Sequence, residues 1–118
     1  MIQYVIEALD HTDTEGLSRR MAFREKHLAG AAALRANGQY VLGGAKLDAD
    51  GKMIGSTMVV QFPTQADFDA YYAQEPYITG KVWGEVKIYK FRVANVVWQF
   101  RHKVDTYAVD TYARVGRW

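Results

Sequence analysis

Residues 40–62 read YVLGGAKLDADGKMIGSTMVVQF, two apolar segments separated by a short polar turn. The turn, Asp48-Ala49-Asp50-Gly51, has the short polar side chains and the glycine that hairpin turns favour. We therefore predict that 40–47 and 53–62 are strands that pair antiparallel.

The sequence before this hairpin predicts a strand and then a helix. Apolar residues alternate through 2–9, a period of two that predicts a strand with one well-buried face. Residues 12–14 are candidate helix caps and Asn37-Gly38 is a candidate helix end. Between them, the side chains predicted to form the buried stripe are Leu17, Met21, Arg24, Leu28, Ala31 and Arg35, with Phe23, His27 and Leu34 along its edge.

The sequence after the hairpin predicts a second helix and a fourth strand. Thr64 followed by Asp67 resembles a capping box, and Pro76 ends the helix that follows. Alternation over 86–91 predicts the strand. The order β-α-β-β-α-β is the ferredoxin-like arrangement of α+β domains, in which two helices cover one face of a four-stranded sheet.

Both faces of the predicted strand 53–62 carry apolar residues. Val59 alternates with Met58 and Val60, so neither face of this strand is polar. A sheet face of this kind is not expected to stay in water. We therefore expect a homodimer in which the open faces of two sheets meet.

The composition fits one domain over 1–93 with an added segment over 94–118. The chain has 118 residues and no cysteine, which excludes disulfides and thiolate metal sites, and its three histidines make a histidine-rich metal cage improbable. The formal charge of +2 lies in 94–118, because acidic and basic residues cancel over 1–93. Such a neutral body argues against nucleic-acid binding. No signal peptide or membrane-spanning run is evident, so we expect a cytoplasmic protein with no membrane contact.

Four short motifs within 1–93 resemble those of a known family. They are Arg24-Glu25-Lys26-His27-Leu28, Gly43-Gly44-Ala45, Gly55-Ser56 and Glu75-Pro76-Tyr77, in this order. Together they make the chain similar to YciI-like proteins of the dimeric α+β barrel group. The resemblance implies a site that pairs a helix histidine with an acidic residue, here His27 and Glu75, although the family has aspartate at the second position. It also implies cofactor-free proton transfer, elimination or isomerisation on a small compound.

The residues themselves suggest roles in such a site. His27 is the candidate general base, since imidazole exchanges protons near neutral pH, and Glu75 is the candidate carboxylate that orients it. Arg24, one helical turn away, is a candidate group for binding an anionic substrate. The remaining candidates are expected to line a ligand pocket beside these residues. Gly44 leaves space over the strand, Ser56 offers a hydroxyl group, and the rings of Tyr77 and Trp83 are candidates for an aromatic wall.

Each of these residues also has a plainer structural interpretation. His27 can be a packed helix residue, Arg24 an ordinary ion pair, the strand glycines a bulge and the rings core or interface. Three functions therefore stay open: a cofactor-free enzyme, a non-catalytic ligand-binding module and a structural dimer. No phosphate-binding glycine motif stands between a strand and a helix, so no nucleotide cofactor is expected.

Two further features bear on partners. RNA-recognition domains share this element order, and their third strand carries a basic residue and stacking aromatic rings. Here 54–62 has no basic residue and one aromatic residue, at its end. The segment 94–118 is rich in aromatic residues, and we expect it to pack on the body or on the partner subunit. Within it VDTYA at 104–108 repeats at 109–113, for which we find no physical reason.

Overall fold

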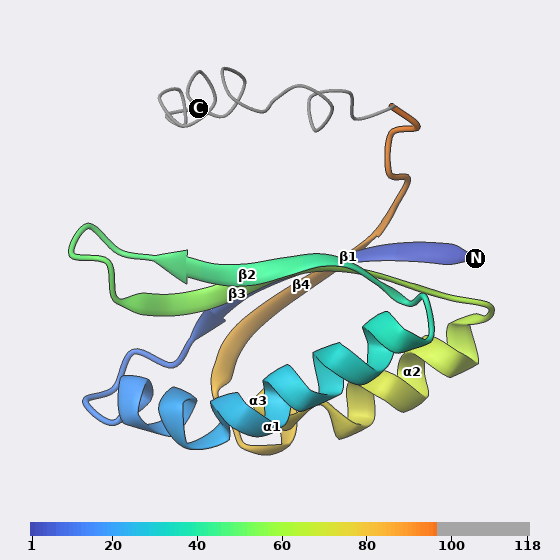
Figure 1. Ribbon diagram of the computed structural model, residues 1–118. Coiled ribbons are helices and arrows are strands. Elements are labelled where there is room, and N and C mark those ends of the chain that lie inside the picture. The colour runs from blue at the N-terminus through green and yellow to red at the C-terminus, as the bar shows by residue number, and fades with distance from the viewer. Residues whose placement is uncertain (97–118) are drawn as a thin grey trace.

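The computed structural model of the protein describes residues 1–96, which form a four-stranded antiparallel sheet with helices on one side (Figure 1). The elements follow the predicted β-α-β-β-α-β order, with one short helix added before the last strand. They are β1 (Ile2–Asp10), α1 (Gly16–Ala36), β2 (Tyr40–Leu47), β3 (Met53–Phe62), α2 (Gln65–Gln74), α3 (Pro76–Thr79) and β4 (Trp83–Phe91). The ferredoxin-like α+β fold is thereby confirmed.

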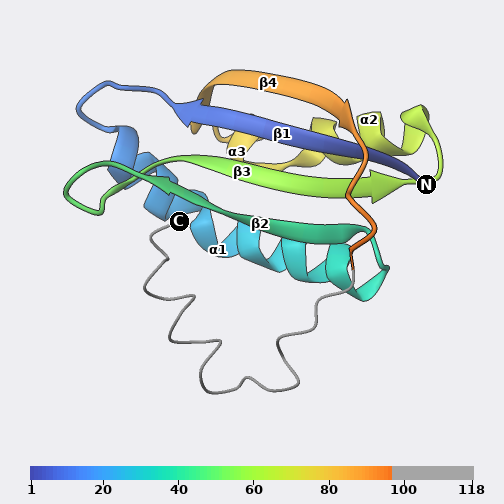
Figure 2. The ribbon, with the colours of Figure 1, turned by 90° about the horizontal axis from the view of Figure 1, so that it is seen from above.

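The sheet order is β2-β3-β1-β4, so the first and third strands are central (Figure 2). The predicted hairpin of β2 and β3 is antiparallel, and its turn is held by Asp48, whose carboxylate accepts from the backbone N–H groups of Asp50 and Lys52. Gly51 has a φ of +84°, a left-handed conformation that a glycine adopts without strain.

The core lies between the sheet and the helices. Even-numbered residues of β1 face the helices, and the register pairs Ile6 with Met58 and Ala8 with Ser56, which continues the same face onto β3. Tyr4, Val60 and the other buried side chains of this face pack against α2 and α3. The side chains of the helices therefore pack against the inner face of the two central strands.

The buried face of α1 differs from the prediction. Leu17, Met21 and Leu28 are exposed, whereas the sheet-facing positions hold Arg20 and His27. The apolar spacing was misleading because each buried polar side chain of α1 has an ionic partner across the interface, which offsets the cost of removing it from water. The face of α1 that meets the sheet therefore carries two polar side chains, Arg20 and His27, where the prediction placed a mainly apolar stripe.

The last strand starts earlier than predicted. β4 begins at Trp83, ahead of the predicted range 86–91, and Trp83 pairs with Asp10 beyond a bulge in the β1–β4 ladder. Lys81, with a φ of +57°, makes the turn that brings the chain from α3 into this strand. The strand thereby fixes the Trp83 ring in the core near the end of β1.

The opposite face of the sheet carries no helix in the described part of the chain (Figure 1). Its apolar residues include Leu42, Tyr89 and Phe91, which are 54%, 51% and 48% exposed, and Val59, which its neighbours bury. On β3 it is therefore Val59, and not Met58 or Val60, that has the parity of the open face.

Residues 97–118 lie outside the described residues, so the packing predicted for 94–118 and the division at residue 93 stay predictions. After β4 the chain is tied to the open-face side by the backbone N–H of Val93, which donates to the Gln3 side chain at 2.7 Å. Within residues 1–96, no helix is both long enough and apolar enough to cross a membrane.

Candidate active site

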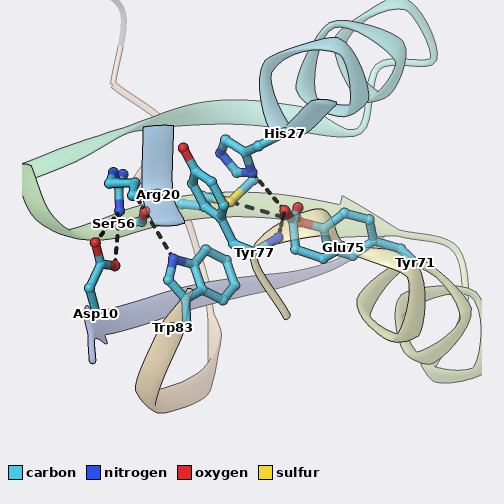
Figure 3. A network of polar contacts seen from close by, with 9 residues as sticks. Asp10, Arg20, His27, Ser56, Tyr71, Glu75, Tyr77 and Trp83 are labelled. Atoms are coloured by element: carbon cyan, nitrogen blue, oxygen red, sulfur yellow. Dashed lines mark hydrogen bonds and ion pairs between the residues drawn. The ribbon is translucent and has the colours of Figure 1, made fainter. Parts of the chain in front are cut away.

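His27 and Glu75, 48 positions apart in sequence, are in direct contact in the core. His27 projects from the middle of α1, and its Nδ1 lies 2.7 Å from Oε2 of Glu75 (Figure 3). Both side chains are buried. The glutamate reaches the imidazole despite its extra methylene relative to the aspartate of the resembled family.

The backbone at Glu75 explains how its carboxylate is placed. Glu75 ends α2 in an extended conformation and caps α3, where Pro76 occupies the first turn and the Glu75 side chain accepts from the backbone N–H of Tyr77 at 3.0 Å. A proline at this position needs no N–H partner and favours the helix start. The Glu-Pro-Tyr sequence therefore directs the carboxylate toward α1.

Glu75 accepts three hydrogen bonds, a number that suits an ionised carboxylate. The third donor is the Tyr71 hydroxyl, at 2.9 Å from Oε1, and burial together with the nearby Glu75 charge raises the pKa of Tyr71, which keeps its hydroxyl protonated. An ionised Glu75 requires a hydrogen on Nδ1 of His27. In the neutral ring, Nε2 is then a free acceptor.

Tyr77 forms a flat surface beneath the histidine. The His27 and Tyr77 rings stack with centroids 4.0 Å apart and an interplanar angle of 11°. Burial raises the pKa of Tyr77, against the opposing charges of Arg20 and Arg24, so its hydroxyl is a donor at neutral pH. The ring fixes the plane of the imidazole and lines the same cavity.

A second buried network, joined to the first through Tyr77, was not predicted from the sequence. Arg20 Nη1 lies 3.0 and 3.1 Å from the two carboxylate oxygens of Asp10, and Nη2 donates to Ser56 Oγ at 2.9 Å. Trp83 Nε1 donates to the same Ser56 oxygen at 3.1 Å (Figure 3). The Arg20 guanidinium also lies 4.7 Å from the Tyr77 ring centroid. Burial raises the pKa of Asp10, and the adjacent Arg20 charge opposes that rise.

Two sequence signals could have revealed this network. Asp10 continues the alternation that buries the even-numbered residues of β1, and Arg20 lies seven residues before His27, on the same face of the helix. A charged residue at a position predicted to be buried requires a partner. Each of these two residues is the partner of the other.

The two networks border one cavity of about 250 Å³ between α1 and the strands β2 and β3. Its lining includes five of the seven sequence-predicted candidates: Arg24, His27, Gly44, Ser56 and Tyr77. Arg24 is exposed. Glu75 and Trp83 do not line the cavity, but each hydrogen-bonds to a residue that does: Glu75 to His27 and Trp83 to Ser56. The volume suits a small molecule, at or below the lower end of typical ligand pockets.

The family assignment comes from comparison with known proteins. The model of the YCII-related domain matches residues 2–92. The chain belongs to the YCII-related family. This YCII-related chain is also 32% identical to an uncharacterized protein from Haemophilus influenzae, and the match covers 75% of this chain and 95% of that protein.

Two solved structures resemble this YCII-related protein in fold. One is 5-chloro-2-hydroxyhydroquinone dehydrochlorinase, TftG, from Burkholderia phenoliruptrix, in complex with 2,5-dihydroxybenzoquinone; it has a TM-score of 0.68 and 18% identity, with 78% of this chain and 95% of that one covered. The other is a dimeric ferredoxin-like protein of unknown function from Jannaschia, with a TM-score of 0.51 and 12% identity over 79% of this chain and 100% of that one. At these identities the likeness extends to the fold alone.

Among residues 1–96, no group of three or more histidine, cysteine, aspartate or glutamate side chains is arranged to hold a metal ion. Of the two arginines that line the cavity, Arg20 is paired with Asp10, and the structure gives no ion pair for Arg24 among residues 1–96. The chemistry that this arrangement offers is proton exchange at His27 and hydrogen-bond donation from the hydroxyl groups and arginines around it.

Proposed function

We propose that this YCII-related protein is a cofactor-free enzyme that transfers protons on a small, oxygen-bearing compound, aromatic or anionic, in the course of an elimination or an isomerisation. The observation that carries the proposal is the contact between His27 Nδ1 and Glu75 Oε2 beside a cavity. A carboxylate at Nδ1 fixes the tautomer in which Nε2 accepts a proton, and it stabilises the imidazolium that forms.

Arg24 and Tyr77 supply substrate binding in this proposal. The exposed Arg24 guanidinium lines the cavity, where it can bind a carboxylate or a phenolate of the substrate. The Tyr77 ring is covered by His27 and Arg20, so its contribution to substrate binding is the hydroxyl group, a hydrogen-bond donor. Tyr77 and Gly44 both line the cavity. TftG carries out an elimination on an oxygenated aromatic compound, as its name states, and that chemistry is of the class proposed here.

We further propose that the protein works as a homodimer. The exposed Leu42, Tyr89 and Phe91 lie on the open face of the sheet, and exposed apolar groups of this size favour burial against a second copy. The absence of cysteine from the sequence fits a reducing compartment, and the cytoplasm is the location that we propose.

Solvent exchange at carbon tests the proposed proton transfer. The probe is phenylpyruvate, which combines a ring, a carboxylate and an acidic C–H next to a ketone; its deuterium uptake from D₂O is followed by proton NMR. The wild type should accelerate the uptake, and His27→Gln should lower the enzymatic rate by about a hundredfold or more. His11→Gln, which changes an exposed histidine outside the cavity, is the matched control and should exchange at the wild-type rate.

Two outcomes would contradict the proposal. Equal rates of deuterium uptake with the wild type and with His27→Gln would show that His27 is not the base. Binding of phenylpyruvate by calorimetry, without exchange above the buffer rate, would favour the alternative, a non-catalytic ligand-binding module.

A further inference from the structure

The hydrogen-bond pattern around Ser56 fixes the direction in which its hydroxyl donates. Its oxygen accepts from Arg20 Nη2 at 2.9 Å and from Trp83 Nε1 at 3.1 Å. A guanidinium and an indole N–H can only donate, so both lone pairs of the serine oxygen are used. The hydroxyl hydrogen is left over, and it has no acceptor among the side chains and backbone of residues 1–96.

The remaining hydrogen is available to the cavity. Ser56 is 1% exposed, yet it is among the lining residues of the space that His27 and Tyr77 also border. Arg20, behind the serine, is held by both carboxylate oxygens of Asp10, so its position is fixed from two sides. A positive charge donating to a hydroxyl oxygen polarises the O–H bond and strengthens it as a donor.

An acceptor, His27, and a donor, Ser56, therefore line the same cavity. His27 stacks on the Tyr77 ring at 4.0 Å, and the Arg20 guanidinium that holds Ser56 lies 4.7 Å from the centroid of the same ring. The Trp83 ring, which also holds Ser56, lies 6.2 Å from the His27 ring, centroid to centroid. A small planar compound in this cavity that contacts both groups can lose a proton at one position and gain a hydrogen bond at another.

We propose that Ser56 is a catalytic residue that donates its hydroxyl hydrogen to a carbonyl or phenolic oxygen of the substrate, which makes the substrate an enolisable carbonyl compound or an acidic phenol. This inference rests on the proposed function. Arg20 and Trp83 act as positioning residues, because they keep the hydroxyl turned toward the cavity. Asp10 acts one step further away by holding Arg20.

The proton-transfer step balances without an oxidant or a further reactant. The C–H bond next to the carbonyl breaks, and its proton forms an N–H bond at Nε2 of His27. The electron pair of that bond becomes the C=C bond of an enolate, and the carbonyl π pair moves to the oxygen that accepts from Ser56. The enolate then takes the proton back at another carbon, or expels a leaving group together with its bonding pair.

Binding of 4-nitrophenol tests this role, because its ionised form resembles an enolate and absorbs visible light that the neutral form does not. The wild type should bind the ionised form, and it should bind 4-nitroanisole, which has no ionisable oxygen, at least about tenfold more weakly. Ser56→Ala should weaken 4-nitrophenol binding by at least about tenfold, the effect expected for a hydrogen bond to a charged oxygen. Ser18→Ala, on the exposed side of α1, is the matched control and should bind as the wild type does.

The outcomes separate this inference from the proposed function. Equal 4-nitrophenol affinity in the wild type and Ser56→Ala, or no binding by the wild type at millimolar concentration, would overturn the inference. If Ser56→Ala does not fold, Ser56→Cys, with a thiol of similar size and weaker donor strength, decides in its place. If affinity depends on Ser56 while the bound probe stays neutral, and His27→Gln changes neither property, the inference stands and the base assigned to His27 fails.

Discussion

Removal of the Glu75 carboxylate should destabilise the protein strongly, because three donors depend on it. In Glu75→Ala, the Tyr77 N–H and His27 Nδ1 lose their acceptor in the core, while the Tyr71 hydroxyl keeps a weak alternative in the Met58 sulfur at 3.7 Å. A buried donor left without a partner costs about 1–3 kcal/mol. The two orphaned donors and the lost cap of α3 together predict a loss of about 3–5 kcal/mol in the free energy of unfolding.

Glu75→Gln should cost much less. The amide oxygen can still accept from His27 and Tyr77, and the Tyr71 hydroxyl can turn to accept from the amide nitrogen. The bonds to His27 and Tyr77 persist but lose the charge that strengthens them, which predicts a loss of about 1–2 kcal/mol.

Urea unfolding at pH 7, followed by far-UV circular dichroism at one fixed protein concentration, measures these losses. Glu85→Gln is the matched control. The Glu85 carboxylate is exposed, and its ion pair with Lys87 is loose, at 3.8 Å, so Glu85→Gln should stay within about 0.5 kcal/mol of the wild type. A loss below about 1 kcal/mol for Glu75→Ala would refute the reasoning, because it would mean that the carboxylate does not hold this part of the core.

Three further predictions follow from other parts of the molecule. The hydrogen bond from Arg19 lowers the pKa of Asp13 to about 2. The stability that this pair contributes is therefore present above the ordinary carboxyl pKa of ~3.9, and it is lost as the pH falls toward about 2. In an NMR titration, Arg19→Gln should return the Asp13 midpoint to the ordinary range. Gly55→Ala should lose about 1–3 kcal/mol in urea unfolding, since a Cβ there meets the backbone of β1, whereas Gly44→Ala meets nothing within 4 Å and should stay near the wild type. Light scattering at micromolar concentration should find a dimer for the wild type and a folded monomer for Leu42→Asp, and a monomeric wild type would contradict the proposed interface.

Local sequence rules predicted the order of the elements because those rules act over short distances. The Asp48–Gly51 turn, the alternation in β1 and the Thr64 cap of α2 each depend on a few neighbouring residues, and each appears where the sequence placed it. The cap predicted for α1 at residues 12–14 was wrong: that helix is capped at Glu15, and no side chain accepts a hydrogen bond there. The contact between His27 and Glu75 needed more: the resemblance named both residues, but nothing in the spacing along the chain brings α1 beside the end of α2.

The buried side of α1 could not be read from apolar spacing. The side chains facing the sheet are Arg20, His27 and Leu34, and the first two are stable there because Asp10 and Glu75 lie opposite. A helix pattern shows which residues share a face, but not which face meets a partner of opposite charge. The donors around Ser56 were missed for the same reason, since they come from α1 and β4 and meet only in the folded protein.

The state of the His27 ring tests the central claim most directly, because the account requires Nε2 to be the atom that accepts the proton. Nitrogen-15 NMR of labelled histidine, with the His27 signals assigned by their absence in His27→Gln, reports which ring nitrogen carries hydrogen. In the neutral ring we predict hydrogen on Nδ1 and none on Nε2, and hydrogen on both once 4-nitrophenol is bound. A neutral ring with its hydrogen on Nε2, or a ring unchanged by the bound probe, would contradict the account.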